Sequence, residues 1–212
     1  MLTVKELRTH GRAGTFSILA ISADSKLMGV AVASGSTAVG SRVPHAKPGI
    51  GVIATQAYTN VAYGIKGLQL VTDGSSPREA LDRLLMEDPG RDLRQVAIMT
   101  FKRSRAVFTG ANAPYWHGEA AGKDYVVIGN LLAGKNVVPS IAEGFERTSG
   151  DLALRMVKAL EAGSESGGDR RGERSAALVV VGLEKVEVKI KVRRHKSPIE
   201  ELTRKLRTNK TA

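Results

Sequence analysis

The order of the strand-forming runs is the feature that most constrains how this chain folds. Residues 15–21 and 28–34 are short apolar runs, and residues 23–26 between them, Ala-Asp-Ser-Lys, have turn chemistry. Two strands joined by so short a turn pair antiparallel. Later strand runs also come in groups, and pairs of helix-forming segments separate these groups. This order favours antiparallel sheets covered by helices over alternating strand–helix–strand units.

The remaining elements follow from periodicity and from helix signals. Ser76, Pro77 and Glu79 form a capping box with proline in the first turn, which predicts the start of a helix. Residues 186–192 alternate strictly, which predicts Val186, Val188, Ile190 and Val192 on a buried face. The expected strands are 15–21, 28–34, 50–57, 95–101, 105–109, 125–128, 176–181 and 186–192. The expected helices are 60–71, 136–148, 151–162, the one from Ser76 and a terminal one from Ser197; segments 35–49 and 110–122 are expected as loops.

Length and composition exclude several classes of protein. The 212 residues suit one ordinary domain, and the absence of cysteine excludes disulfides and thiolate zinc sites. No run approaches the ~18 apolar residues of a membrane span, and residues 1–14 lack the apolar core of a signal peptide. We therefore expect no membrane contact and a cytoplasmic location. Asn and Gln together number only eight, which is typical of proteins from hot habitats.

The net charge of +11 is concentrated near the C-terminus. Residues 185–212 hold ten Lys or Arg and three Glu, a net charge of +7. A basic segment of this kind can bind anionic surfaces or nucleic-acid phosphates. No nucleic-acid motif accompanies it, however, and aromatic residues make up only 4% of the chain. A solvated basic face is the favoured interpretation, and an anionic partner for 185–212 is the alternative.

Thr15 carries distinctive chemistry if it becomes the first residue of a processed chain. A free N-terminal threonine combines a nucleophilic hydroxyl with an α-amine that titrates near ~8 and can take its proton. Gly14 precedes Thr15, so removal of the start methionine does not expose it. The alternative is that Thr15 simply begins a strand.

Several strings in the sequence resemble a single family. They include Thr15-Phe16-Ser17-Ile18, Ala54-Thr55-Gln56, Arg94-Gln95-Val96, Phe108-Thr109-Gly110, Gly-Val-Ala-Val-Ala-Ser at 29–34, Gly-Asn-Leu-Leu-Ala-Gly at 129–134 and Gly-Gly-Asp-Arg-Arg-Gly at 167–172. With them, the chain from Thr15 to about Leu206 resembles the domain of unknown function 1028 (DUF1028) family of bacteria and archaea. That family is grouped with the N-terminal nucleophile (Ntn) hydrolases, which include proteasome subunits and amidases. The resemblance implies an α+β fold, a four-layer αββα sandwich of antiparallel sheets, and it brings no known substrate.

The resemblance also implies roles for individual residues. Thr15 is the expected nucleophile, and Lys47 is the expected cation that tunes it, as in proteasome-like subunits. Asn130 is expected to donate to the oxyanion, and Asp169 to orient the Thr15 amine with assistance from Ser175. The residues expected to bind substrate are Ser34, Gln56, Asn60 and Ser175.

Each of these assignments has a plainer alternative. Lys47 can be an exposed loop lysine, and Asn130 a turn residue that satisfies its own backbone. Asp169 can form an ion pair with Arg170 or Arg171. Gln56 and Asn60 can cap the helix that follows them.

The sequence departs from the family pattern at both ends. Family members commonly begin Met-Thr-Phe-Ser, whereas Thr15 follows a longer extension here. Residues 1–14 are therefore interpreted as an extension and a candidate propeptide, 15–192 as the Ntn-like domain, and 193–212 as a basic C-terminal helix packed on or trailing that domain. Residues 193–198, Arg-Arg-His-Lys-Ser-Pro, stand where members often carry an acidic string, so no metal site is assigned to His195.

Two main hypotheses of function follow. In the first, the protein hydrolyses a small-molecule or peptide amide with Thr15, without cofactor or metal, after cleavage of the Gly14–Thr15 bond. In the second, it is a non-catalytic binding or structural protein with an unprocessed N-terminus. By analogy with other four-layer sandwiches, self-association into a homo-oligomer is expected.

Overall fold

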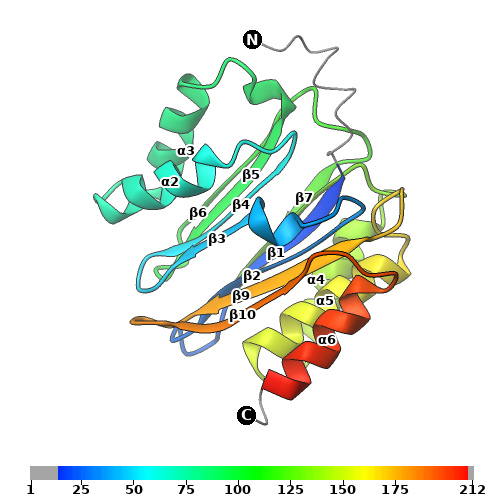
Figure 1. Cartoon of the computed structure of the whole chain (residues 1–212). Helices are drawn as coiled ribbons and strands as arrows, with labels where there is room; N and C mark the ends of the chain where they lie inside the picture. The colour runs from blue at the N-terminus through cyan, green and yellow to red at the C-terminus, as the bar shows by residue number, and fades with distance from the viewer. Residues whose placement is uncertain (1–13, 210–212) are drawn as a thin grey trace.

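Two antiparallel β-sheets stack face to face in the computed structural model, which describes residues 14–209 (Figure 1). The first sheet has six strands, in the spatial order β10 (Val186–Val192), β9 (Ser175–Val181), β2 (Met28–Ser34), β1 (Thr15–Ile21), β8 (Tyr125–Asn130) and β7 (Gly118–Ala121). The second has four, in the order β3 (Pro44–Lys47), β4 (Gly51–Ala57), β5 (Arg94–Thr100) and β6 (Arg105–Thr109).

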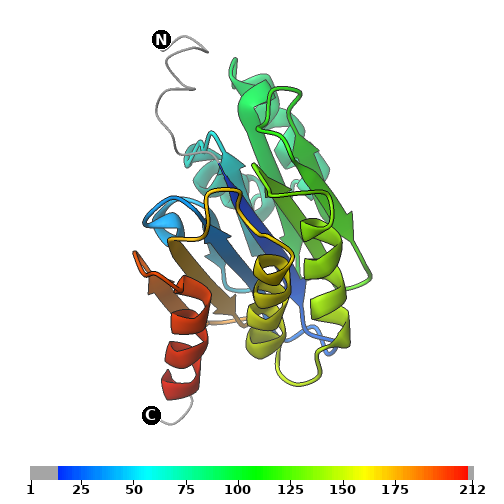
Figure 2. The ribbon, with the colours of Figure 1, turned by 90° about the vertical axis from the view of Figure 1, so that its right-hand side faces the viewer.

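Helices cover the outer face of each sheet. The six-stranded sheet carries α4 (Val137–Arg147), α5 (Leu152–Glu165) and α6 (Pro198–Asn209), which lie side by side in Figure 2. The four-stranded sheet carries α2 (Ala62–Thr72) and α3 (Pro77–Met86). Two single 3₁₀ turns, η1 (Val39–Ser41) and η2 (Arg91–Leu93), complete the elements. The layers are helix, sheet, sheet and helix, so the expected αββα sandwich is confirmed.

Strand β1 lies near the centre of the molecule, and all seven of its residues are buried. Phe16 and Ile18 pack into the core beneath the helices, whereas Leu19 and Ile21 pack into the core between the two sheets. A strand covered on both faces must be apolar throughout, which is why this run shows no polar alternation. Thr15, its first residue, pairs with Asn130 of β8 at one end of the sheet.

The expected loops contain two strands that the sequence did not predict. Segment 35–49 includes β3, and segment 110–122 includes β7; each is four residues long and lies at a sheet edge. Pro44 begins β3, a position where a missing N–H does no harm to the ladder. Because such short edge strands are only half buried, they carry no clear apolar alternation.

The alternation expected in β10 holds over only part of the strand. Ile190 and Val192 are buried, but Val186 is 46% exposed. An irregularity in the pairing with β9 falls between Val186 and Val188. It shifts the register of Val186 relative to the rest of β10. The prediction that Val186 faces inward was therefore wrong.

The helix signals were more dependable. Ser76 and Glu79 form the expected capping box at the start of α3. Helix α6 packs on α5, β9 and β10, and buries Ile199, Leu202 and Leu206. Among residues 14–209, none of the helices combines the length and the apolar character needed to cross a membrane.

Matched leucine substitutions test where the core lies. Leu160 of α5 is fully buried beneath the six-stranded sheet, and Leu183, in the β9–β10 turn, is 58% exposed. We expect Leu160→Ala to lower the free energy of unfolding by about 2–5 kcal/mol, because it removes apolar contacts and leaves a cavity. Leu183→Ala should change it by less than about 0.5 kcal/mol. Urea denaturation followed by circular dichroism measures both, and equal losses would contradict this packing.

Candidate functional site

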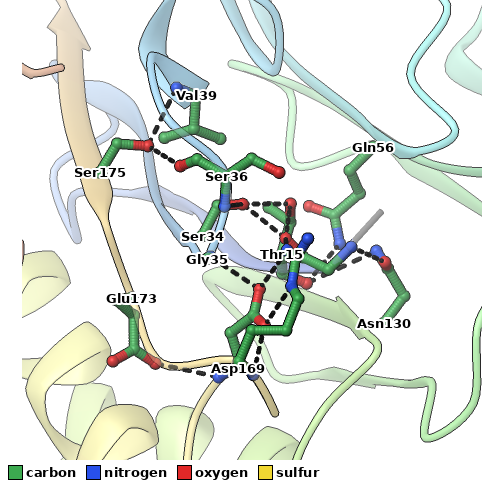
Figure 3. Close-up of polar contacts among 12 residues, drawn as sticks. Thr15, Ser34, Gly35, Ser36, Val39, Gln56, Asn130, Asp169, Glu173 and Ser175 are labelled. Carbon is green, nitrogen blue, oxygen red and sulfur yellow. Dashed lines mark hydrogen bonds and ion pairs between the residues drawn. The ribbon is translucent and has the colours of Figure 1, made fainter. Parts of the chain in front are cut away.

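A polar cluster lies around Thr15 and Ser34 at one end of the six-stranded sheet (Figure 3). Its centre is the carbonyl oxygen of Gly14. Three groups lie within hydrogen-bond distance of it: the Thr15 hydroxyl at 2.5 Å, the Ser34 hydroxyl at 2.5 Å and Nη2 of Arg171 at 3.1 Å. Thr15 is only 3% exposed and Ser34 is fully buried. The cluster therefore holds one peptide carbonyl between two buried hydroxyls and one partly exposed guanidinium.

The pairing of β1 with β2 brings Ser34 to Thr15. Phe16 pairs with Ala33, so the last residue of β2 lies beside the first residue of β1. The two hydroxyl oxygens are 3.2 Å apart, and the backbone N–H of Ser36 donates to the Ser34 hydroxyl at 3.0 Å. Ser34 is thus oriented from two sides, with its own proton directed to the Gly14 carbonyl.

Asp169 and Arg171 form an ion pair behind this carbonyl, in which the carboxylate is buried and the guanidinium is partly exposed. The Asp169 side chain is fully buried and accepts from Nε and Nη2 of Arg171 at 3.0 and 2.9 Å. It also accepts from the backbone N–H of Gly35 at 2.7 Å. The carboxylate thereby aims the guanidinium at Gly14. Asp169 reaches the nucleophile region through Arg171, one of the two ion-pair partners that were its plainer alternative.

The loop 167–172 needs glycine to present this pair. Gly168 has φ +53° and Gly172 has φ +74°, conformations that residues with a Cβ rarely adopt. The turn closes with the Gly172 N–H donating to the Asp169 carbonyl at 2.8 Å, while Glu173 accepts from the Asp169 N–H at 2.9 Å. The glycine-rich string therefore works as a rigid support for one ion pair.

Asn130 lies in the cluster, but with a different orientation from the expected one. Its Oδ1 accepts from the backbone N–H of Gly14 at 3.0 Å. Its Nδ2, the expected oxyanion donor, points to Oε1 of Gln95 at 3.1 Å and to the carbonyl of Thr15 at 3.5 Å. In this arrangement Asn130 holds the residue before Thr15 and gives no hydrogen bond to the Gly14 carbonyl.

A network of carboxamides lies beneath the cluster, between the two sheets. Gln56 donates to the Thr15 carbonyl at 3.2 Å and to Oε1 of Gln95 at 2.8 Å, and it accepts from Ser17 at 2.6 Å. Nε2 of Gln95 lies within reach of Thr109 and of the Gly118 and Gly129 carbonyls. Gln56 and Gln95 are fully buried. Gln56 therefore supports the strand that carries Thr15 and does not line an open pocket.

Ser175 and Asn60 lie outside this cluster. The Ser175 hydroxyl donates to the Ser36 carbonyl at 2.6 Å and accepts from the Val39 N–H at 3.1 Å, so it fixes the loop that follows Ser34. Oδ1 of Asn60 accepts from the Ala62 N–H at 3.1 Å, at the start of α2. Asn60 therefore lies one residue before the N-cap of α2, which is Val61, and its side chain accepts from the first residue of that helix.

The structure does not bring Lys47 to Thr15. Lys47 ends β3 opposite Gly51, whereas Gln56, which contacts Thr15, lies about 17 Å further along β4 at ~3.3 Å per residue. Its Nζ donates to the Thr72 hydroxyl at 3.0 Å. The expected catalytic spacing assumed that 35–49 is a loop, but strand β3 carries Lys47 to the opposite end of the sheet. Among residues 14–209, the cation beside the Gly14 carbonyl is Arg171.

Two residues of the site had no assigned role from the sequence. Arg171 was only a partner for Asp169, and Gln95 was only part of a resembling string. A usable signal existed for each: Gln95 is an uncharged polar residue directly before the apolar run 96–99, and Arg171 lies in a loop bounded by glycines. Such isolated polar residues in buried runs need partners, and those partners define the site.

Gly14 itself fits its position closely. Its φ is +109°, and a Cβ built on it would collide with Nη2 of Arg171 and lie 2.6 Å from Oδ2 of Asp169. Only glycine is compatible with this conformation and this space. Residues 1–13 of the expected extension lie outside the described residues.

The family model of DUF1028, described as a family of unknown function, matches residues 15–202. The chain belongs to the DUF1028 family. A DUF1028 protein from Silicibacter pomeroyi has a solved structure with a TM-score of 0.88 and 30% identity, covering 94% of this chain and 88% of that chain. No match was found among curated proteins.

Two solved structures of Anbu, the ancestral beta-subunit, are more distant from this DUF1028 chain. The one from Yersinia bercovieri has a TM-score of 0.46 and 10% identity, covering 93% of this chain and 94% of that chain. A mutant Anbu from Hyphomicrobium sp. strain MC1 has a TM-score of 0.42 and 10% identity, covering 94% of this chain and 97% of that chain.

Replacing Gln95 tests the carboxamide network. Gln95→Leu would leave buried amide groups of Gln56 and Asn130 without their shared acceptor. We expect the free energy of unfolding to fall by about 1–3 kcal/mol or more, since unpaired buried polar groups carry their full desolvation cost. The matched control is Gln69→Leu on α2, where the side chain is exposed; it should cost less than about 0.5 kcal/mol. A neutral Gln95→Leu would contradict the network.

Proposed function

We propose that this DUF1028 protein is an Ntn-type amide hydrolase that uses Thr15 after cleaving its own Gly14–Thr15 bond. The observation that carries the proposal is the position of the Gly14 carbonyl. It lies against the Thr15 hydroxyl and receives donors from Ser34 and Arg171. Donors placed around a carbonyl oxygen stabilise the negative charge that develops there when the carbon is attacked.

The first step is an N-to-O shift. The Thr15 oxygen forms a bond to the Gly14 carbonyl carbon, the bond from that carbon to the Thr15 nitrogen breaks, and the hydroxyl proton ends on the nitrogen. Water then hydrolyses the ester, which releases the Gly14 carboxylate and leaves a free Thr15 amine. The oxyanion formed in each step receives the Ser34 and Arg171 donors.

In turnover, the acyl part of an external amide takes the place of Gly14. Its carbonyl accepts from Ser34 and Arg171, and an N–H on the acyl side donates to Oδ1 of Asn130, as the Gly14 N–H does in the intact chain. The free Thr15 amine is the base for its own hydroxyl. Asp169 acts as a positioning residue through Arg171, and Lys47 has no role in this scheme.

Substitution of Thr15 tests the proposed nucleophile. Intact mass spectrometry of untagged protein should show a species that begins at Thr15 in the wild type and in Thr15→Ser, but not in Thr15→Ala. Thr15→Ala should shift the melting temperature by only about 2–4 °C, because it removes about one hydrogen bond from a protein of this size. An almost unchanged melting temperature would show that Thr15→Ala loses cleavage without losing its fold.

A stable full-length mass after long incubation near the growth temperature would contradict the proposal. An intact chain has an amide nitrogen at Thr15, which cannot serve as a base. That result would favour the non-catalytic alternative, a binding or structural role for the same fold.

Substitution of Gly14 tests the geometry of the cleaved bond. Gly14→Ala should slow cleavage about tenfold or more, because its Cβ would displace the carbonyl from Arg171. Gly74→Ala is the matched control: Gly74 has a similar φ of +98°, but no atom lies within 4 Å of the added Cβ. Cleavage in that variant should match the wild type. Equal cleavage rates in the wild type, Gly14→Ala and Gly74→Ala would show that cleavage does not depend on the close fit of Gly14 against Arg171.

A further inference from the structure

A pocket of about 630 Å³ opens beside the site just described. Its walls are Gly35, Ser36, Thr37, Ala38, Arg42, Arg171 and Arg174. It is continuous with the cluster in two places. Ser36 donates its N–H to the Ser34 hydroxyl (Figure 3). Arg171 donates to the Gly14 carbonyl. A molecule whose amide occupies the place of the Gly14 peptide therefore has this pocket next to it.

Three arginines from separate parts of the chain line the pocket. Arg42 follows η1, Arg171 belongs to the glycine-rich loop, and Arg174 directly precedes β9. None of the lining residues is acidic. Of the two carboxylates of the neighbouring loop, Asp169 pairs with Arg171 and offsets the charge of that one lining residue. Glu173 is turned away and accepts from Ser164 and from the Asp169 N–H, so Arg42 and Arg174 supply the net positive charge of the pocket.

Ser36 gives a second, independent indication of a ligand. The residue is 9% exposed, and among the described residues its hydroxyl has no hydrogen-bond partner. A buried hydroxyl without a partner is costly, and such groups in folded proteins call for an explanation. Ser36 lines the pocket, and its hydroxyl oxygen is buried in this arrangement, so a ligand accepts a hydrogen bond from it once the side chain rotates toward the pocket.

We infer that this pocket binds an oxyanion group, a carboxylate or a phosphate, carried by the amide substrate. The statement that the ligand is an amide rests on the proposed function. Binding of an anion in this pocket does not require the protein to be an active hydrolase. Guanidinium groups match carboxylate and phosphate oxygens with paired hydrogen bonds, and several of them around one pocket favour an anion strongly. The substrate class is then an amide with a negatively charged group close to the scissile bond.

Direct binding tests the inference without requiring catalysis. The protein is the full-length Thr15→Ala variant, which does not turn over, and the probes are glutarate and inorganic phosphate. Uncharged glutaramide is the control for glutarate. Isothermal titration at low salt should show saturable binding of one or both anions and at least tenfold weaker binding of glutaramide. Preference for one anion identifies which source the pocket suits.

Two arginine variants locate the binding. Arg174→Gln should weaken anion binding about three- to tenfold, the loss of one charge-assisted contact. Arg170→Gln is the matched control, because Arg170 is an exposed neighbour in the same loop and does not line the pocket. It should bind within twofold of the parent.

The outcomes separate this inference from the proposed function. If neither anion binds, or if Arg174→Gln and Arg170→Gln weaken anion binding equally, the anion site is overturned even if Thr15 proves to be the nucleophile. Anion binding that is lost in Arg174→Gln supports the site even if the wild-type chain is never cleaved.

Discussion

The contact on which the site depends is the one between Gln95 and its two carboxamide neighbours. Most side chains between the two sheets are apolar, and dispersion and burial hold them together without fixing the position of one strand along another. Gln95 is different because its acceptor oxygen receives both Gln56 and Asn130. One residue of β5 thereby joins its neighbour in the four-stranded sheet to a strand of the other sheet. The position of Thr15 relative to both sheets follows from these directional bonds.

The charge in the site is organised around a single guanidinium. Arg171 is shared between a buried carboxylate and a peptide carbonyl, so the protein offsets the cost of burying Asp169 and aims a cation with the same contact. A lysine at this position would supply charge without the fixed fork that reaches both partners. This explains how the cluster has a cation beside the Gly14 carbonyl although Lys47 lies at the opposite end of the sheet.

Elements that carry their own physical signal were predictable from the sequence. The capping box at Ser76 and the apolar strand run of 15–21 are local properties, and the αββα layers were expected from the family resemblance. Strand β3 was not predictable, because its four half-buried residues have no pattern distinct from a loop. The undetected strand also explains why Lys47 was expected near Thr15, since that expectation rested on spacing alone. Arg171 and Gln95 acquire their contacts only when distant segments meet, and spacing in one sequence does not show such meetings.

The break in register and the lysines of β10 have a consequence for how copies of this chain meet. β10 is an edge of the six-stranded sheet, and its Lys189 and Lys191 are exposed. A long, regular and uncharged edge is a template on which another chain can add a strand. Here the register is broken near one end, and like charges would face each other along the rest. Part of the basicity of the C-terminal region therefore protects an open sheet from growing into an aggregate.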